Sequence, residues 1–191
     1  MKKASGFVYI IAALLLGPYT AHAENGTEPT QQSALGVCYG ESKSAWLVGL
    51  GIEGKETAEQ TDKFIASLPH SSDSKTKIAD GATAMRQGRF TAAEDLGAAQ
   101  YASCAKTHSL QGVDPNKIAD CFYYLRIMNS FHASKKRGDS EDQALDSMIK
   151  VSPGATEVTK RLLAFLATRT YETKDINLEH RMTFDWCAGK R

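Results

Sequence analysis

The chain has 191 residues, with 23 basic and 22 acidic side chains and a formal net charge of +1. Because the charges are balanced and interspersed, the composition favours neither a nucleic-acid partner nor an anionic membrane surface. None of the four cysteines lies in a Cys-x-x-Cys pattern, so nothing indicates a zinc ribbon, a thioredoxin-like redox site or covalent haem. We therefore expect no cofactor and no bound nucleic acid.

The first 23 residues have the order of a bacterial secretory signal peptide. Lys2 and Lys3 precede an apolar run over 7–16, and the small-residue triplet 21–23 ends at Ala23. The apolar run is shorter than the ~20 residues that span a bilayer, and no later stretch is longer. We expect cleavage after Ala23, a periplasmic or secreted protein without membrane insertion, and a flexible polar leader over 24–32.

From residue 33 the apolar positions follow helical spacing. The first helix is expected to end within 49–54, and the second to begin at Thr57, where Gln60 completes a capping box. A third helix is expected over 74–87, and Thr91–Glu94 is expected to be the capping box of a fourth. One stripe of the first helix consists mainly of small residues, which would allow another helix to approach closely: Leu35, Cys38, Ser42, Ala45 and Gly49.

Gly49, Gly51 and Gly54 also satisfy the glycine pattern of dinucleotide-binding proteins. The segment 132–138 holds the same place in the second half of the chain and lacks two of these three glycines. We therefore interpret 49–54 as a helix-ending turn, not as a nucleotide site.

A boundary is expected in the linker 111–116, where Gly112 precedes Asp114-Pro115. After it, helical spacing predicts a fifth helix ending near Gly138 and a sixth beginning at the cap Ser140. A seventh helix is expected around 158–166 and an eighth over 176–187, with Leu178, Met182 and Trp186 on its second face. Alternation of the kind found in strands is absent, so we expect an all-α fold.

The cysteines indicate a duplication. Cys38 and Cys104 are 66 positions apart, as are Cys121 and Cys187, and the second pair lies 83 positions after the first. This predicts two tandem helical units of about four helices each, 33–110 and 117–191, each stapled by one disulfide. Four cysteines allow three pairings. The pairing within each unit repeats one geometry twice, whereas the others join equivalent helices or bridge the linker.

No catalytic or metal-binding motif occurs, and none of the histidines is paired with another at metal-ligand spacing. His132 lies on the apolar stripe of the fifth helix and is expected to be a hydrogen-bonded core residue. Contact with a partner is instead expected from the polar loop between Pro69 and Lys75 and from two tyrosines. These predicted partner-binding residues are His70, Ser71, Ser72, Asp73, Tyr123 and Tyr124.

In its signal peptide, its helical make-up and its paired cysteines Cys38/Cys104 and Cys121/Cys187, the chain resembles the periplasmic immunity proteins of type VI secretion amidase effectors. The duplication departs from the shorter single-unit members. The resemblance implies a non-enzymatic inhibitor that covers the catalytic cleft of a peptidoglycan-cutting enzyme. Two alternatives stay open, a periplasmic hydrolase with its site between the units and a general envelope scaffold. A homodimer is also possible.

Overall fold

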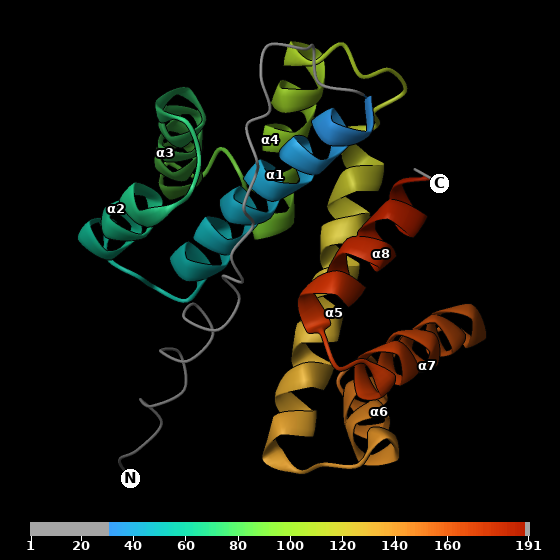
Figure 1. The fold of residues 1–191 in the computed structure, drawn as a ribbon. Helices are drawn as coiled ribbons and strands as arrows, with labels where there is room; N and C mark the ends of the chain where they lie inside the picture. The colour runs from blue at the N-terminus through green and yellow to red at the C-terminus, as the bar shows by residue number, and fades with distance from the viewer. Residues whose placement is uncertain (1–30, 190–191) are drawn as a thin grey trace, which may run out of the picture. The chain divides into compact units, whose positions relative to one another are not determined.

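The computed structural model describes residues 31–189, which form eight α-helices and no strand (Figure 1). The predicted all-α fold is therefore confirmed. The predicted signal peptide, 1–23, and most of the leader, 24–30, lie outside the described residues. The helices are α1 (Gln31–Glu53), α2 (Ala58–Ser67), α3 (Ser72–Arg86), α4 (Ala93–Thr107), α5 (Pro115–Arg137), α6 (Glu141–Lys150), α7 (Glu157–Glu172) and α8 (Ile176–Ala188).

The chain divides into two compact units, and the division falls between Ala119 and Asp120 in the first turns of α5. Unit 1 contains α1 to α4, and unit 2 contains most of α5 together with α6 to α8. Two expected boundaries shift: 31–32 already belong to α1, and 115–116 of the expected linker already belong to α5. Within the described residues, no helix is both long enough and apolar enough to cross a membrane.

Each unit holds one disulfide, as the repeated spacing predicted. Cys38 of α1 is bonded to Cys104 of α4, and Cys121 of α5 is bonded to Cys187 of α8. The Cα atoms of the two pairs are 5.3 and 5.6 Å apart, within the usual range for disulfides. The pairing within each unit is thus confirmed, while the duplication itself stays a prediction.

In unit 1, α1 packs along α4, and α3 also contacts α1. A Cβ atom on Gly49 would lie 2.7 Å from the Cα of Ala93 at the start of α4, so the two backbones meet at a position that only glycine fits. Gly49 and Gly51 both lie inside α1, which ends at Glu53. The expected end of the helix is correct, but the glycine at position 49 serves helix packing and not the turn. The apolar core of this unit includes Val48, Ile65, Leu68, Ile78 and Leu96.

The helix starts show which caps the sequence can reveal. The capping box expected at Thr57 and the cap expected at Ser140 are both present, and Ser140 also forms a box with Gln143. The box expected at Thr91–Glu94 is wrong, because α4 begins one residue later, after Ala92. There the Asp95 carboxylate accepts the N–H of Ala92, and Glu53 from the end of α1 accepts the N–H of Ala93 at 2.7 Å. A partner from another helix has replaced the local hydroxyl.

In unit 2, the rings of Phe122 on α5 and Phe184 on α8 pack with their centroids 5.1 Å apart. The fully buried histidine of this unit is His180 on α8. The expectation for His132 is wrong: the ring is only half-buried, and its Nδ1 atom has no hydrogen-bond partner among the described residues. Burial and the nearby charges of Lys136 and Lys135 lower the pKa of His132.

The end of α7 is capped by a lysine from α5. Lys135 Nζ donates to the carbonyl oxygens of Thr170, Tyr171 and Thr173, with the closest contact, to Tyr171, at 2.8 Å. These carbonyls are the acceptors that a helix leaves unpaired at its C-terminus, so the cation stabilises them.

Candidate functional site

The segment 70–73, predicted as a binding loop, is mostly the start of α3. Ser71 is the N-cap, and its hydroxyl accepts the N–H of Ser74. Ser72 and Asp73 form the first helical turn, and the Asp73 carboxylate pairs with Lys77 at 2.8 Å. Ser71, Ser72 and Asp73 are all exposed. They therefore present a rigid, polar helix end where the sequence suggested a loop.

His70 does not project with these residues. Its Nε2 atom lies 2.8 Å from the hydroxyl of Ser44 on α1, and the ring is half-buried. Burial lowers the pKa of His70, Glu41 opposes this shift, and Lys75 adds to it. The imidazole is thus neutral near pH 7 and is held by α1, so it does not offer a cation to a partner.

A partly buried polar network centred on Glu41 lies near this histidine. The carboxylate of Glu41 on α1 accepts hydrogen bonds from Ser74 on α3 and from Gln100 on α4. Each carboxylate oxygen has its own donor, so the network joins three helices. Sequence reasoning missed Glu41, Ser44 and Gln100, because they come from distant parts of the chain without a motif.

The Ser44–His70 pair has the spacing of a nucleophile and its general base. Ser44, however, is only 6 % exposed. Both oxygens of the nearby Glu41 carboxylate accept hydrogen bonds from other residues, Ser74 and Gln100, so this acid is engaged by α3 and α4. The arrangement is better suited to fastening α1 to the start of α3.

The two tyrosines predicted to contact a partner differ in how deeply they are buried. Tyr123 on α5 is exposed, whereas Tyr124 is half-buried. Of these two tyrosines, Tyr123 is therefore the better aromatic anchor.

Among residues 31–189, a set of exposed large apolar side chains on neighbouring helices lies on α7 and α8 of unit 2. We call it the α7–α8 apolar face. Its side chains are 43 to 77 % exposed. Positions 158 and 165 share one stripe of α7, and 178, 182 and 186 share one stripe of α8. The rings of Phe165 and Trp186, the last residues of the two stripes, pack with their centroids 5.6 Å apart and so join the stripes. The face consists of Val158, Phe165, Leu178, Met182 and Trp186.

Three of the five residues of this face are visible in the sequence. Helical spacing places Leu178, Met182 and Trp186 on a second face of the eighth helix, but it predicts no contact with a partner for them. The signal available was three large apolar residues at a spacing of four on a helix whose other face is already apolar.

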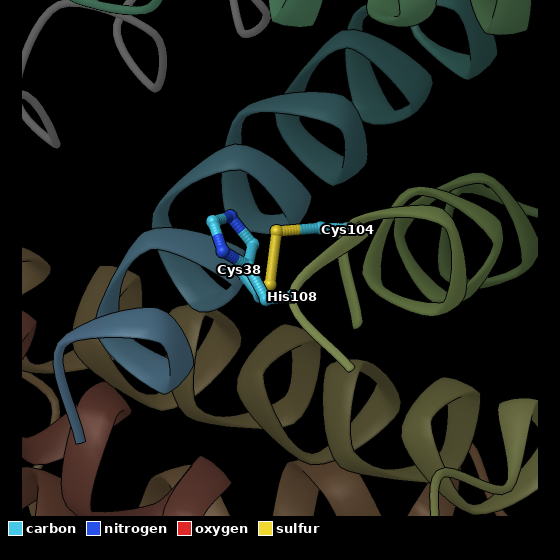
Figure 2. A group of neighbouring side chains, drawn as sticks. All are labelled: Cys38, Cys104 and His108. Atoms are coloured by element: carbon cyan, nitrogen blue, oxygen red, sulfur yellow. A yellow bond between two sulfur atoms is a disulfide. The ribbon is translucent and has the colours of Figure 1, made fainter. Parts of the chain in front are cut away.

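Beside the disulfide of unit 1 lies His108, one turn after Cys104 at the end of α4 (Figure 2). One ligand atom from each of Cys38, Cys104 and His108 lies within 4.8 Å of the others. The sulfurs are nearly inaccessible, whereas the imidazole is half-buried. While the disulfide is intact it offers no thiolate, so the group cannot hold a metal in this form.

The surface of the described part of the chain includes two open hollows. One lies at the end of α4 and is lined by residues within 102–113, and the other lies between α5 and α6. Neither lining contains a histidine, a cysteine or a carboxylate. Neither hollow therefore has the convergent ionisable groups of an enzyme active site.

Comparisons with protein-family models, with curated proteins and with solved structures gave no match to this chain.

Proposed function

We propose that this chain is an exported protein that acts by binding another protein, and that it is an immunity protein inhibiting a secreted peptidoglycan-degrading amidase. The observation that carries the binding function is the α7–α8 apolar face. Apolar side chains exposed together on neighbouring helices are typical of protein contact surfaces. Aromatic residues such as Phe165 and Trp186 are also the type that contributes most to binding energy at the centre of an interface.

The surroundings of this face suit a protein partner. Ion pairs are present on the same two helices, Lys160 with Glu157 on α7 and Arg181 with Asp185 on α8. Since Lys160 and Arg181 are each matched by an anion, the ion pairs beside the face do not favour a strongly charged ligand. An apolar centre with a polar rim is the usual composition of a protein–protein interface.

The disulfides support export and a rigid binding surface. Structural disulfides persist in oxidising compartments such as the periplasm, which agrees with the signal peptide expected over 1–23. The Cys121–Cys187 disulfide joins α8 to α5, so that one of the two stripes is held to its unit. A surface that is ordered before binding loses less conformational entropy on association.

The identity of the partner rests on the resemblance to amidase immunity proteins. In this proposal the partner contacts the α7–α8 apolar face, and the helix end Ser71–Asp73 and Tyr123 are further contact candidates. His70 and Tyr124 are weaker candidates, because their side chains are half-buried. A second copy of the chain is the competing occupant of the same face.

The test is inhibition of a purified cell-wall amidase from the same envelope, measured together with the dissociation constant. We expect Phe165→Ser combined with Trp186→Ser to weaken binding by at least about 100-fold. Val37→Ser is the matched control, because Val37 is an exposed apolar residue of unit 1 and should leave the affinity unchanged.

A combined Ser71→Ala, Ser72→Ala and Asp73→Ala variant tests the helix end separately. Loss of affinity in this variant alone would move the contact to α3 and reject the apolar face. Failure to inhibit any amidase would reject the partner. Sedimentation equilibrium tests whether a second copy of the chain covers this face. A dimer that is lost in the Phe165→Ser, Trp186→Ser variant would assign the face to self-association.

A hydrolase is the second candidate, favoured by the Ser44–His70 pair at 2.8 Å. Such an enzyme would lose all hydrolytic activity on Ser44→Ala, with the helical content retained. Hydrolysis of peptidoglycan by the purified chain that disappears in this variant would replace the inhibitor proposal.

A further inference from the structure

We propose that the α7–α8 apolar face binds the same face of a second copy of this chain, with the two α7 helices antiparallel. In this arrangement Arg161 of each copy lies opposite Glu172 of the other. The inference goes beyond the proposed function, because it concerns the free chain and requires no amidase. If both hold, the dimer and the complex with the amidase exclude each other, so the dimer must dissociate before the inhibitor acts.

Two charged side chains of this surface have no partner within the chain. Arg161 and Glu172 are exposed on α7, and among residues 31–189 neither makes an ion pair or a side-chain hydrogen bond. All other acidic and basic side chains of α7 and α8 are paired: Glu157 with Lys160, Arg169 with Glu179, and Arg181 with Asp185. The two helices therefore leave one cation and one anion for a contact outside the chain.

Both charges lie on the exposed side of α7, in line with the apolar face. Arg161 and Glu172 are eleven residues apart. This is close to three helical turns, so the two side chains leave the helix in nearly the same direction, about 16 Å apart. Phe165, one turn after Arg161, is 45 % exposed. The buried residues of α7 lie on the opposite side: Leu163, Leu166, Ala167 and Thr170.

This stripe is complementary to itself after rotation by half a turn. When two antiparallel copies of α7 are aligned so that Arg161 faces Glu172, the reverse pair forms as well, because a two-fold axis makes every contact reciprocal. The two copies of Phe165 then come close to the axis, each with the Trp186 ring against which it packs at 5.6 Å. An apolar centre with charged pairs at the rim is the usual composition of an interface. A second copy supplies this order of charges without any further partner.

The charge pattern also selects the antiparallel arrangement. Parallel copies of α7 in register would place Arg161 against Arg161 and Glu172 against Glu172, and like charges that meet in an interface weaken it. The antiparallel alignment has no such conflict along α7. Each remaining charged residue of the helix comes opposite an uncharged one: Glu157 opposite Ile176, Lys160 opposite Thr173, and Arg169 opposite Ala164.

The test is sedimentation equilibrium of the full chain as exported, with both disulfides formed. We expect the parent chain to dimerise with a dissociation constant below about 100 µM. Arg161→Glu and Glu172→Arg should each weaken the dimer by at least about 10-fold, because each places two pairs of like charges in the interface. Arg89→Glu is the matched control, since it makes the same change at an exposed residue of unit 1, and should leave the dissociation constant unchanged. Circular dichroism checks that each variant keeps its helical content.

Exchange of the two charges gives the sharpest result. A chain that carries both Arg161→Glu and Glu172→Arg has the opposite order of charges and should dimerise within about threefold of the parent. A mixture of the two single variants should form a heterodimer, because both reciprocal pairs are then again of opposite charge. Neither single variant should dimerise alone at the same concentration.

A parent chain that stays monomeric at about 100 µM would overturn the proposal. So would single variants that dimerise within about threefold of the parent, or a mixture of them that forms no heterodimer. A dimer lost in the Phe165→Ser, Trp186→Ser variant but insensitive to both charge reversals would reject this alignment. Species that grow beyond a dimer would reject the two-fold contact in favour of a head-to-tail one. None of these measurements involves an amidase, so failure of the proposed function would leave their outcome unchanged.

Discussion

The two disulfide-stapled units differ most in the size of the side chains between their long helices. On the face where α1 meets α4, unit 1 has small residues, whereas the positions 83 residues later in unit 2 have large ones. The pairs are Ser42 and Leu125, Ala45 and Met128, Gly49 and His132, and Gly97 and His180.

This difference separates what a disulfide determines from what packing determines. The stapled Cα atoms are almost equally far apart in the two units, at 5.3 and 5.6 Å. The backbones of α1 and α4 meet at Gly49, whereas unit 2 fills the same frame with rings such as Phe122 and Phe184. A disulfide therefore sets one point of contact, and side-chain volume sets how the helices approach beyond it.

Removal of the disulfides should have the largest effect. Both close loops with a sequence separation of 66, so the chain-entropy contribution is the same for each, about 4 kcal/mol. We expect Cys38→Ser with Cys104→Ser, and Cys121→Ser with Cys187→Ser, each to lower the free energy of unfolding by about 2 to 5 kcal/mol. Urea unfolding measures it. If the two losses of unfolding free energy differ by more than about 1 kcal/mol, the surrounding packing changes how much an equivalent disulfide stabilises its unit.

Gly49→Ala tests the close approach in unit 1 directly. The new Cβ would lie 2.7 Å from the Ala93 Cα, so α1 and α4 must move apart at a cost of about 1 to 3 kcal/mol. Gly40→Ala is the matched control on the same helix, because the nearest atom there is 4.0 Å away. The control should be neutral or stabilising by up to about 1 kcal/mol. Equal effects of Gly49→Ala and Gly40→Ala on stability would contradict the close approach of α1 and α4 at Gly49.

The caps of α2 and α6 should behave alike in the two units. Thr57 and Ser140 each form a capping box with the glutamine three residues later, and the hydrogen bonds of both boxes are solvent-exposed. Thr57→Ala and Ser140→Ala should each cost about 1 kcal/mol, and Thr57→Ser should cost little. Thermal unfolding measures the loss of stability in each variant. A loss in only one of the two variants would show that the two caps do not contribute equally to the stability of their units.

The smallest effect should be a pH dependence of stability from His132. Its pKa is lowered from 6.5 by burial and by Lys136 and Lys135, so the folded chain favours the neutral ring. Stability is unaffected above pH 6.5 and falls below it, because the unfolded chain then binds the proton more readily. His132→Gln should reduce the loss of stability between about pH 7.5 and about pH 5.5. An unchanged slope would assign the dependence to other groups such as His70, whose pKa is also lowered.

Several features of the candidate site were not predictable from the sequence. The polar segment 70–73 was predicted as a loop, whereas it is mostly the start of α3, and the inward position of His70 depends on Ser44, which is 26 residues away. The Glu41 network and the approach of His108 to the disulfide likewise join residues from different helices. Such contacts have no local pattern.

The sequence by itself determined the all-helical fold and the capped helix starts at Thr57 and Ser140, and it favoured the pairing of Cys38 with Cys104 and of Cys121 with Cys187. Helical periodicity, caps and repeated spacing are all local or arithmetic properties of the chain. Only the tertiary structure decided that Gly49 is a point of contact and not a turn, that Glu53 replaces a hydroxyl at the start of α4, and that Phe165 meets Trp186 on an exposed face. The physical reason is that burial and hydrogen bonding across helices depend on which faces meet, and no single helix contains that information.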